Sequence, residues 1–207
     1  EQQGGIRHPT RPRQGILMDI IDRAVSVLMH DGLIIYPTDT LYGLGADAFS
    51  DEAIEKVYEA KKRDLAKPIS IAVSDFEMLA AVSHVDRSME EFIEKFLPGP
   101  VTVIVPARKT IPDILTGGAG MIGIRIPAHG VALQIIERFD APITATSANL
   151  SGGKDPQTPE ECTVPRDLFI DGGRLSGTPS TVVDLVRKSI VRRGIDADAI
   201  EAFLKSS

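Results

Sequence analysis

An apolar segment runs directly into a polar turn in the stretch Leu33-Ile34-Ile35-Tyr36-Pro37-Thr38-Asp39-Thr40-Leu41-Tyr42-Gly43-Leu44-Gly45. Leu33–Tyr36 predicts a short strand that ends at Pro37, because proline has no N–H to donate to a sheet. The hydroxyl groups that follow both donate and accept hydrogen bonds, which suits an amino acid or a nucleotide as ligand. A plain turn capped by Asp39 and Thr40 explains the same residues equally well.

Helices and strands are predicted on both sides of this stretch. Apolar residues at helical spacing predict helices over Met18–His30, Asp51–Ala60, Phe76–Val82, Arg87–Phe96, Val131–Phe139 and Ala197–Leu204. Short β-branched runs predict strands over Leu33–Tyr36, Ile69–Val73, Val101–Val105, Met121–Ile126, Ile143–Thr146, Thr181–Leu185 and Ile190–Arg192. This order indicates an α/β fold with one twisted, mixed sheet and packed helices. Ligands of open α/β sheets bind beyond the carboxyl ends of the strands.

The composition is that of a globular domain with a real core. The chain has 207 residues, 43% of them hydrophobic and 25% charged, and a net charge of −6. We expect a single domain over residues 15–207, after a flexible basic tail over residues 1–14 that carries Arg7, Arg11 and Arg13. The acidic balance argues against nucleic acid as the main ligand, because phosphate contacts need a basic surplus.

The cysteine and histidine content indicates the cellular compartment and bears on whether the protein binds a metal. Cys162 is the lone cysteine and cannot form an internal disulfide, so we expect a reducing compartment, the cytoplasm. No apolar run approaches the ~18 residues that a membrane span needs, so we expect no membrane span. The four histidines have no metal-ligand spacing, so we expect no structural zinc site and no metal-ligating side chains. The sequence also lacks the glycine-rich P-loop motif, so any ATP site is of another kind.

A cluster of four cations follows the predicted helix Asp51–Ala60, in Lys61-Lys62-Arg63-Asp64-Leu65-Ala66-Lys67-Pro68. Residues two apart do not share a helix face, but they share one side of an extended chain. Lys61 and Arg63 can therefore reach one anion only where the helix has ended, and an ammonium beside a guanidinium suits a polyphosphate. The alternative is a charged helix end that complements the macrodipole.

Two further polar segments accompany predicted strands. Ser147 and Asn149 stand two apart after a strand, so their side chains can point together into a crevice, although an ordinary Asx or Ser turn uses the same residues. Ser180 precedes the strand Thr181–Leu185, and Arg192 and Arg193 end the neighbouring one. Because successive residues of a strand alternate faces, only one of these two arginines can face a given pocket.

Arg125 is a charged residue inside an apolar predicted strand. A charge in that position is seldom buried unless it is paired. Arg125 therefore needs an anion, and a substrate carboxylate and an internal Asp or Glu are equally good partners.

Taken together, these segments resemble the short form of the YrdC-like threonylcarbamoyl-AMP synthase family, from about Met18 to Gly194 and in the family's order. The resemblance rests on Tyr36–Gly45, Lys61-x-Arg63, Pro98-Gly99-Pro100-Val101-Thr102, Gly123–Pro127, Ser147-Ala148-Asn149-x-Ser151-Gly152 and Ser180–Leu185. Each motif alone is weak, whereas six motifs in order are specific.

The resemblance implies a nucleotidyltransferase, L-threonylcarbamoyladenylate synthase. The amine of L-threonine would capture bicarbonate or CO2, and the carbamate would attack the α-phosphate of ATP with loss of pyrophosphate. By resemblance, ATP would be held, with Mg²⁺ on its phosphates, by Lys61, Arg63, Lys67, Ser147, Asn149 and Arg192. Lys61 and Arg63 would be the catalytic pair, and threonine would be held by Thr40, Arg125 and Ser180. A separate threonylcarbamoyl-transferase complex would then complete the t6A modification of tRNA.

The chain departs from the family pattern at several positions. Lys62 and Asp64 stand where Gly and Pro are frequent, Ala72 replaces a histidine, Met121 a threonine and Pro179 a glutamate. These departures leave open a paralogue of uncertain activity. A second alternative is a double-stranded RNA-binding or ribosome-maturation protein, whose cation clusters would contact tRNA or double-stranded RNA. A third is a carbamoyl-adenylate domain of hydrogenase maturation, which normally sits in a much longer chain.

Overall fold

The computed structural model describes residues 14–206 of the chain. Its helices are α1 Gln14–Leu28, α2 Asp51–Lys61, α3 Phe76–Val82, α4 Arg87–Phe96, α5 Asp113–Thr116, α6 Gly130–Phe139 and α7 Ala197–Ser206. Its strands are β1 Ile34–Pro37, β2 Tyr42–Gly45, β3 Ile71–Ala72, β4 Val101–Pro106, β5 Met121–Arg125, β6 Ile143–Thr144, β7 Thr146–Ser147, β8 Leu168–Phe169, β9 Thr181–Asp184 and β10 Ser189–Arg192. No helix within residues 14–206 is long and apolar enough to cross a membrane.

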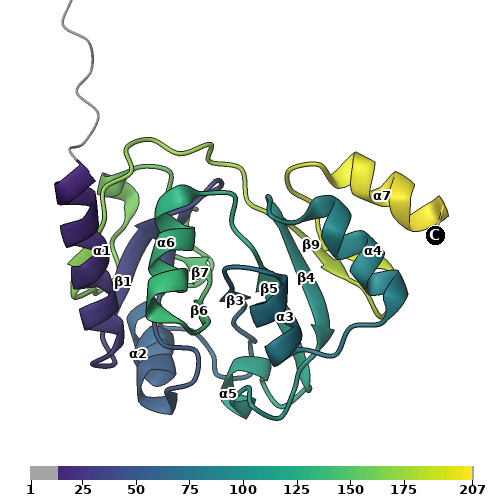
Figure 1. Ribbon diagram of the computed structural model, residues 1–207, viewed down its shortest axis with the longest axis horizontal. Helices are drawn as coiled ribbons and strands as arrows, with labels where there is room; N and C mark the ends of the chain where they lie inside the picture. The colour runs from purple at the N-terminus through teal and green to yellow at the C-terminus, as the bar shows by residue number, and fades with distance from the viewer. Residues whose placement is uncertain (1–13, 207) are drawn as a thin grey trace, which may run out of the picture.

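The strands form two mixed sheets. One has the order β7-β2-β1-β8, and the other has the order β10-β9-β4-β5-β3-β6. Both combine antiparallel and parallel pairs: β1 is antiparallel to β2 and parallel to β8, while β4 is antiparallel to β5 and parallel to β9. Helices α1 and α6 lie beside β1 at one end of the molecule, and α4 and α7 lie beside β4 and β9 at the other (Figure 1).

The predicted α/β class with mixed sheets is confirmed, but the strands are divided between two sheets where one was expected. The reason lies in two segments. Tyr42–Gly45 was assigned to a turn, yet it folds back on β1 as a hairpin strand. Residues 143–146 were expected to form one strand, but β6 pairs with β3 and β7 pairs with β2. The tail predicted over residues 1–14 lies outside the described residues except for Gln14, which begins α1.

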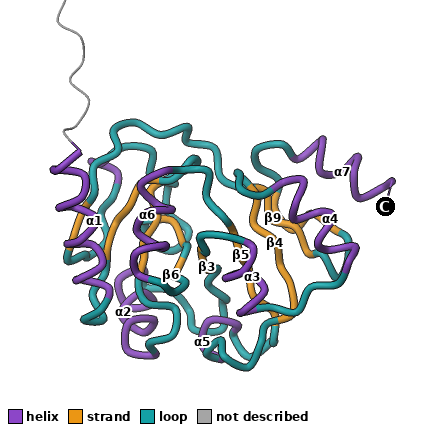
Figure 2. Tube along the Cα trace, viewed as in Figure 1, coloured by secondary structure: helices purple, strands orange, loops and turns teal. Residues whose placement is uncertain are grey.

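The hydrophobic core continues from one sheet to the other. The larger buried cluster includes Ile35 and Leu44 of the four-stranded sheet together with Val103 and Ile124 of the six-stranded sheet. A smaller cluster packs α1 and α6 against β1. The chain also crosses between the sheets in the long connection from β8 to β9, which runs as a loop over one edge of the molecule (Figure 2).

Thr144 joins the two sheets where the chain passes from β6 to β7. Its side chain is fully buried. Its hydroxyl donates to the carbonyl of Leu44 at 2.9 Å and accepts from the N–H of Ala46 at 3.0 Å. Its own N–H donates to Ala46 O at 2.9 Å, and the Tyr36 hydroxyl donates to Thr144 O at 3.2 Å. One residue of the six-stranded sheet thus satisfies several polar groups of the other sheet.

The two glycines of β2 make room for the Tyr36 ring. A Cβ on Gly43 would lie 2.9 Å from Tyr36 Cζ, and one on Gly45 would lie 2.9 Å from Tyr36 Cε1. Real side chains do not approach a ring this closely, so both positions need glycine. Close packing on the tyrosine therefore explains the glycines that follow the polar turn.

We expect Thr144→Val to destabilise the protein by about 1–3 kcal/mol, because the buried N–H of Ala46 loses its acceptor while the branched shape is kept. Urea denaturation followed by circular dichroism would measure the change. Thr144→Ser is the matched control, since it keeps the hydroxyl and both hydrogen bonds and should lose less stability. Equal losses in the two variants would contradict a role of the hydroxyl in joining the sheets.

Candidate active site

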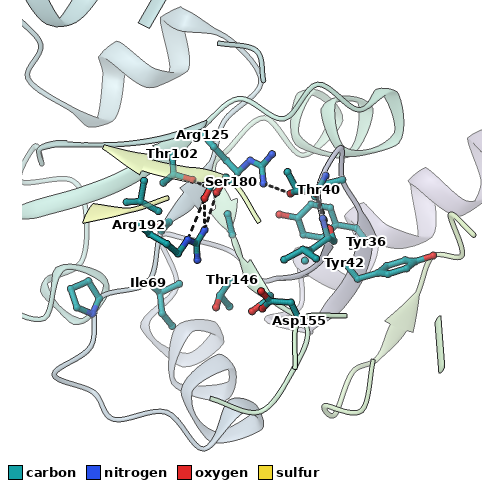
Figure 3. Close-up of a pocket in the computed structure, with 18 of the residues that line it drawn as sticks. Tyr36, Thr40, Tyr42, Ile69, Thr102, Arg125, Thr146, Asp155, Ser180 and Arg192 are labelled. Atoms are coloured by element: carbon teal, nitrogen blue, oxygen red, sulfur yellow. Dashed lines mark hydrogen bonds between the residues drawn. The ribbon is translucent and has the colours of Figure 1, made fainter. Parts of the chain in front are cut away.

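A cleft of about 820 Å³ of empty space, its open mouth included, lies between the two sheets. The turn after β1 and strand β2 form one wall, and β4, the end of β5, β9 and β10 form another. The segment from β6 to β7 passes between them (Figure 3). Six of the predicted site residues line the cleft, namely Thr40, Arg63, Arg125, Ser147, Ser180 and Arg192. Lys61, Lys67 and Asn149 are not among the lining residues.

Arg125 reaches the cleft from the end of β5 and is fixed by the turn after β1. Its Nη1 donates to Thr40 Oγ1 at 2.9 Å, and its Nη2 forms an ion pair with Asp39 Oδ1 at 2.6 Å. Thr40 Oγ1 is in turn bonded to Thr38 Oγ1 at 3.0 Å. The internal carboxylate partner is therefore present and Arg125 also lines the cleft, while a substrate carboxylate on Arg125 stays a prediction.

Three buried polar atoms have no partner within residues 14–206, and all belong to the surroundings of this ion pair. They are Asp39 Oδ2, Arg125 Nε and His129 Nδ1. Burial lowers the pKa of His129, and the nearby Asp39 carboxylate opposes that shift. Buried polar groups of this kind are nearly always paired in proteins, so their concentration at one place marks a functional or hydrated site.

Arg192 and Ser180 belong to the wall that β4, β5, β9 and β10 form. The Arg192 guanidinium donates to the carbonyl of Ser180 through Nε at 3.2 Å and Nη2 at 2.9 Å, and Nη2 also lies 3.0 Å from Ser180 Oγ. Ser180 Oγ is 3.0 Å from Thr102 Oγ1 on β4. Figure 3 shows these three side chains together at one side of the cleft, with Arg125 next to them and reaching toward Thr40.

The structure resolves which of the two adjacent arginines faces the cleft. A register irregularity between Ile190 and Arg192 turns the chain within the β9–β10 pair. Arg192 lines the cleft, whereas Arg193 forms ion pairs with Asp198 and Glu201 of α7. Of the two arginines, Arg192, which the resemblance assigns to ATP, is therefore the one that lines the cleft.

Lys61 lies behind the cleft wall, with 1% of its surface exposed. Its ammonium donates to Ser147 O, to Asn149 O at 2.7 Å and to Asn149 Oδ1 at 3.2 Å. Burial, and then the charge of Arg63, lower the pKa of Lys61 to about 8, while Asp155 opposes the shift. Lys61 thus ties the end of α2 to the loop after β7, directly behind Ser147.

Arg63 turns away from Lys61 because α2 ends between them. Lys62 has φ 49° and ψ 45°, the left-handed conformation that commonly ends a helix and that glycine adopts at lower cost. The Arg63 guanidinium then donates to the carbonyl of Lys67 at 3.2 Å and of Pro68 at 2.8 Å. Lys67 contributes this carbonyl, while its exposed side chain does not line the cleft.

Asn149 shapes the loop below the cleft. Its Oδ1 accepts from Ser147 Oγ at 2.6 Å as well as from Lys61, and its Nδ2 donates to the carbonyls of Gly153 at 2.9 Å and Lys154 at 3.0 Å. The Asn149 side chain therefore holds its own loop, although not through an Asx turn, because its Oδ1 accepts from the Ser147 and Lys61 side chains, whereas Ser147 lines the cleft.

The prediction of site residues missed several that line the cleft, among them Ser70, Thr102, Thr146 and Asp155. Thr102 could have been found, because its hydroxyl interrupts the apolar run Val101–Val105. Asp155 follows a Gly-rich loop in which polar residues are ordinary, so the pattern carried no signal. Within residues 14–206 no group of three or more His, Cys, Asp or Glu side chains could hold a metal ion.

Comparison with known proteins gives consistent matches. The profile of the Sua5/YciO/YrdC family, described as telomere recombination, matches residues 26–194. A threonylcarbamoyl-AMP synthase of Pyrococcus abyssi is 36% identical over 170 residues, which are 78% of this chain and 49% of that protein. The structure of P. abyssi Sua5 complexed with L-threonine matches with a TM-score of 0.80 and 34% identity over 84% of this chain and 54% of that one. The structure of E. coli YciO matches with a TM-score of 0.80 and 30% identity over 91% and 93%.

The relatives differ in length. The chain spans about half of the P. abyssi synthase and of the P. abyssi Sua5 structure, and nearly all of YciO. The similarity thus covers the part of the relatives that corresponds to the cleft-bearing fold.

We expect Arg192→Ala to weaken binding of ATP, the nucleotide that the resemblance implies, at least ~10-fold, because it removes a charged donor from the cleft. Isothermal titration calorimetry would measure the affinity. Arg193→Ala is the matched control: it removes the same charge from an exposed ion pair, and should change affinity less than about twofold and leave the stability nearly unchanged. Equal losses of ATP affinity in the two variants would show that the overall charge of the protein, and not a contact between Arg192 and the nucleotide, governs binding.

Proposed function

Because the chain belongs to the Sua5/YciO/YrdC family, we propose that it is an L-threonylcarbamoyladenylate synthase. The observation that carries the proposal is the set of cations that line one cleft. A guanidinium fixed beside a threonine hydroxyl lines it together with two further cations, Arg63 and Arg192. The first arrangement suits a small carboxylate and the second a polyphosphate. A cleft that accepts an amino acid and a nucleotide together is what this reaction requires.

The proposed reaction joins three substrates. The amine of L-threonine attacks bicarbonate or CO2 to form a carbamate, with loss of water when bicarbonate is the donor. A carbamate oxygen then attacks the α-phosphorus of ATP, and the bond to the bridging oxygen of pyrophosphate breaks. The products are threonylcarbamoyl-AMP and pyrophosphate. Within residues 14–206 no histidine lines the cleft, so orientation and electrostatic stabilisation would supply most of the catalysis.

On the threonine side, Arg125 would bind the carboxylate and the hydroxyls of Thr40 and Ser180 would orient the rest of the amino acid. Arg125 still has N–H groups that neither Asp39 nor Thr40 occupies. Asp39 keeps the guanidinium in place before threonine arrives. The P. abyssi relative that was crystallised with L-threonine supports threonine as the amino acid.

On the ATP side, the six proposed residues would act at different distances. Arg63, Ser147 and Arg192 line the cleft and would contact phosphates directly. Lys61, the other member of the proposed catalytic pair, would act through Ser147, whose backbone it holds while it adds positive charge from behind. Asn149 would act through the loop it organises, and Lys67 from the rim.

Mg²⁺ would supply neutralisation of charge on the triphosphate. The cleft offers hard oxygen donors of the kind this ion prefers, namely the Thr146 and Ser147 hydroxyls and the Asp155 carboxylate. The donor set therefore fits Mg²⁺ shared with phosphate oxygens, a site that the protein completes only with nucleotide.

The proposed product is a reactive mixed anhydride, so a threonylcarbamoyl-transferase complex that consumes it is the expected partner. We place this sequence of reactions, the t6A modification of tRNA, in the cytoplasm, which agrees with a lone, buried cysteine. Direct contact with tRNA or double-stranded RNA stays a prediction, and salt-dependent RNA binding would test it.

Release of pyrophosphate from ATP should require both L-threonine and bicarbonate, and Arg63→Ala should reduce it at least ~10-fold because a charge that contacts the phosphates is lost. A coupled pyrophosphate assay would follow the reaction. Lys62→Gly is the matched control, since it removes a neighbouring exposed cation at a left-handed position and should retain activity. Absence of threonine-dependent release from folded protein would contradict the proposed function.

The affinity for ATP should fall as the pH rises from about 7 to 9. The pKa of Lys61 is lowered to about 8, so its positive charge is present below that pH and is lost above it. Titration calorimetry at several pH values would measure this effect, with Lys61→Met, once shown to be folded by thermal melting, as the comparison. The variant should bind ATP more weakly at pH 7 and show a smaller pH dependence. An equal pH dependence would assign the effect to another group.

A further inference from the structure

Asp155 is a carboxylate in a cleft that is otherwise lined by cations and hydroxyls. It is the only acidic side chain among the described residues that line the cleft, where Arg63, Arg125 and Arg192 also lie. It is half-buried, and no described residue hydrogen-bonds to it or forms an ion pair with it. Figure 3 shows its carboxylate directed into the cleft near Thr146. Its oxygens are therefore free to bind something that enters the cleft.

The surroundings of Asp155 are those proposed for the phosphates. Its charge raises the pKa values of Lys61 and Arg192 against the lowering effect of burial, so the carboxylate lies close enough to both cations to interact with them. It follows the loop that Lys61 and Asn149 hold, and the carbonyl of the next residue, Pro156, accepts from Tyr42 N at 3.1 Å. A bare triphosphate next to this carboxylate would be repelled, because like charges at short range are unfavourable.

A divalent cation between the two anions would remove this repulsion. Mg²⁺ in nucleotide sites keeps several waters and is bound through one or two carboxylates together with substrate phosphates. An aspartate with a threonine or serine hydroxyl is the donor set that nucleoside triphosphatases use for this ion. Asp155 and Thr146 line the same cleft and supply this pair of donors. Because no larger group of ligating side chains is present within residues 14–206, the phosphates would have to complete the coordination.

We propose that Asp155 is the protein's carboxylate ligand for the Mg²⁺ of bound MgATP, with the Thr146 hydroxyl beside it, so that the cleft selects metal-bound over metal-free nucleotide. The proposal rests on the proposed function, since it needs ATP in this cleft. It assigns the carboxylate a task that the cationic side chains of the same cleft cannot perform.

The test compares binding of α,β-methylene-ATP, which cannot react at the α-phosphate, with Mg²⁺ and with EDTA. Isothermal titration calorimetry would be carried out on the unaltered protein, Asp155→Asn and Asp64→Asn. The unaltered protein should bind the magnesium form at least ~10-fold more tightly than the metal-free form. Asp155→Asn should bind the magnesium form more weakly and the metal-free form more tightly, because the variant loses a ligand and also a repulsive charge.

The Asp64→Asn control and the remaining outcomes distinguish metal binding by Asp155 from an effect of its charge or of altered structure. Asp64 is exposed, does not line the cleft and accepts from Ala66 N at 2.9 Å, so Asp64→Asn removes one charge close to Arg63 without touching the proposed ligand, and should behave as the unaltered protein. If Asp155→Asn tightens or weakens both forms equally, Asp155 acts by charge or structure alone and the proposal is wrong. No binding of either form by the unaltered protein would overturn the proposed function as well.

A second measurement detects the metal directly. Mn²⁺ replaces Mg²⁺ in oxygen sites, and electron paramagnetic resonance reports how much of it is free. With α,β-methylene-ATP present, Asp155→Asn should release at least ~10-fold more Mn²⁺ than the unaltered protein at equal nucleotide occupancy. Equal amounts of free Mn²⁺ would show that the phosphates alone hold the metal and would overturn the proposal.

Discussion

The chain changes sheets between β6 and β7, and Thr144 fixes the change. Its buried hydroxyl donates to one backbone group and accepts from another on the far sheet, in surroundings where an unpaired polar group is costly. The cleft exists because the sheets are held at this junction: Thr40 and Gly43 come from the β1–β2 hairpin of one sheet, and Arg125 and Arg192 come from β5 and β10 of the other. Residues far apart in the sequence therefore form one site only when the junction is made.

The cations of the site are oriented before any ligand binds, and mostly by neutral acceptors. Arg63 and Arg192 donate to backbone carbonyls and a serine hydroxyl, and Lys61 donates to carbonyl and amide oxygens. Neutral acceptors fix direction without cancelling charge, which is the condition for electrostatic preorganisation. Arg125 differs, because Asp39 neutralises much of its charge. Its contribution to binding a carboxylate is therefore geometric more than electrostatic.

The sequence predicted the class of fold and most of its helices because apolar periodicity reports burial of one face. It could not predict two sheets, since a Gly-rich strand such as Tyr42–Gly45 has the composition of a turn and only Tyr36 shows why glycine is needed. Among site residues, those placed at strand ends reached the cleft, as Arg125 and Ser180 did. Lys61, Lys67 and Asn149 did not, because spacing along a chain does not tell whether a polar side chain serves a ligand or its own loop.

The departures from the family pattern fall outside the lining of the cleft. Lys62 occupies a left-handed position where glycine would cost less, and Asp64 points back to its own loop. Ala72 is buried in the core between α1, α6 and β1, and Met121 and Pro179 are half-buried away from the lining. None of these five substitutions therefore alters a side chain that lines the cleft. For the proposed triphosphate, the negative charge that matters is therefore that of Asp155, which lines the cleft with its oxygens unpaired, and not that of the exposed Asp64.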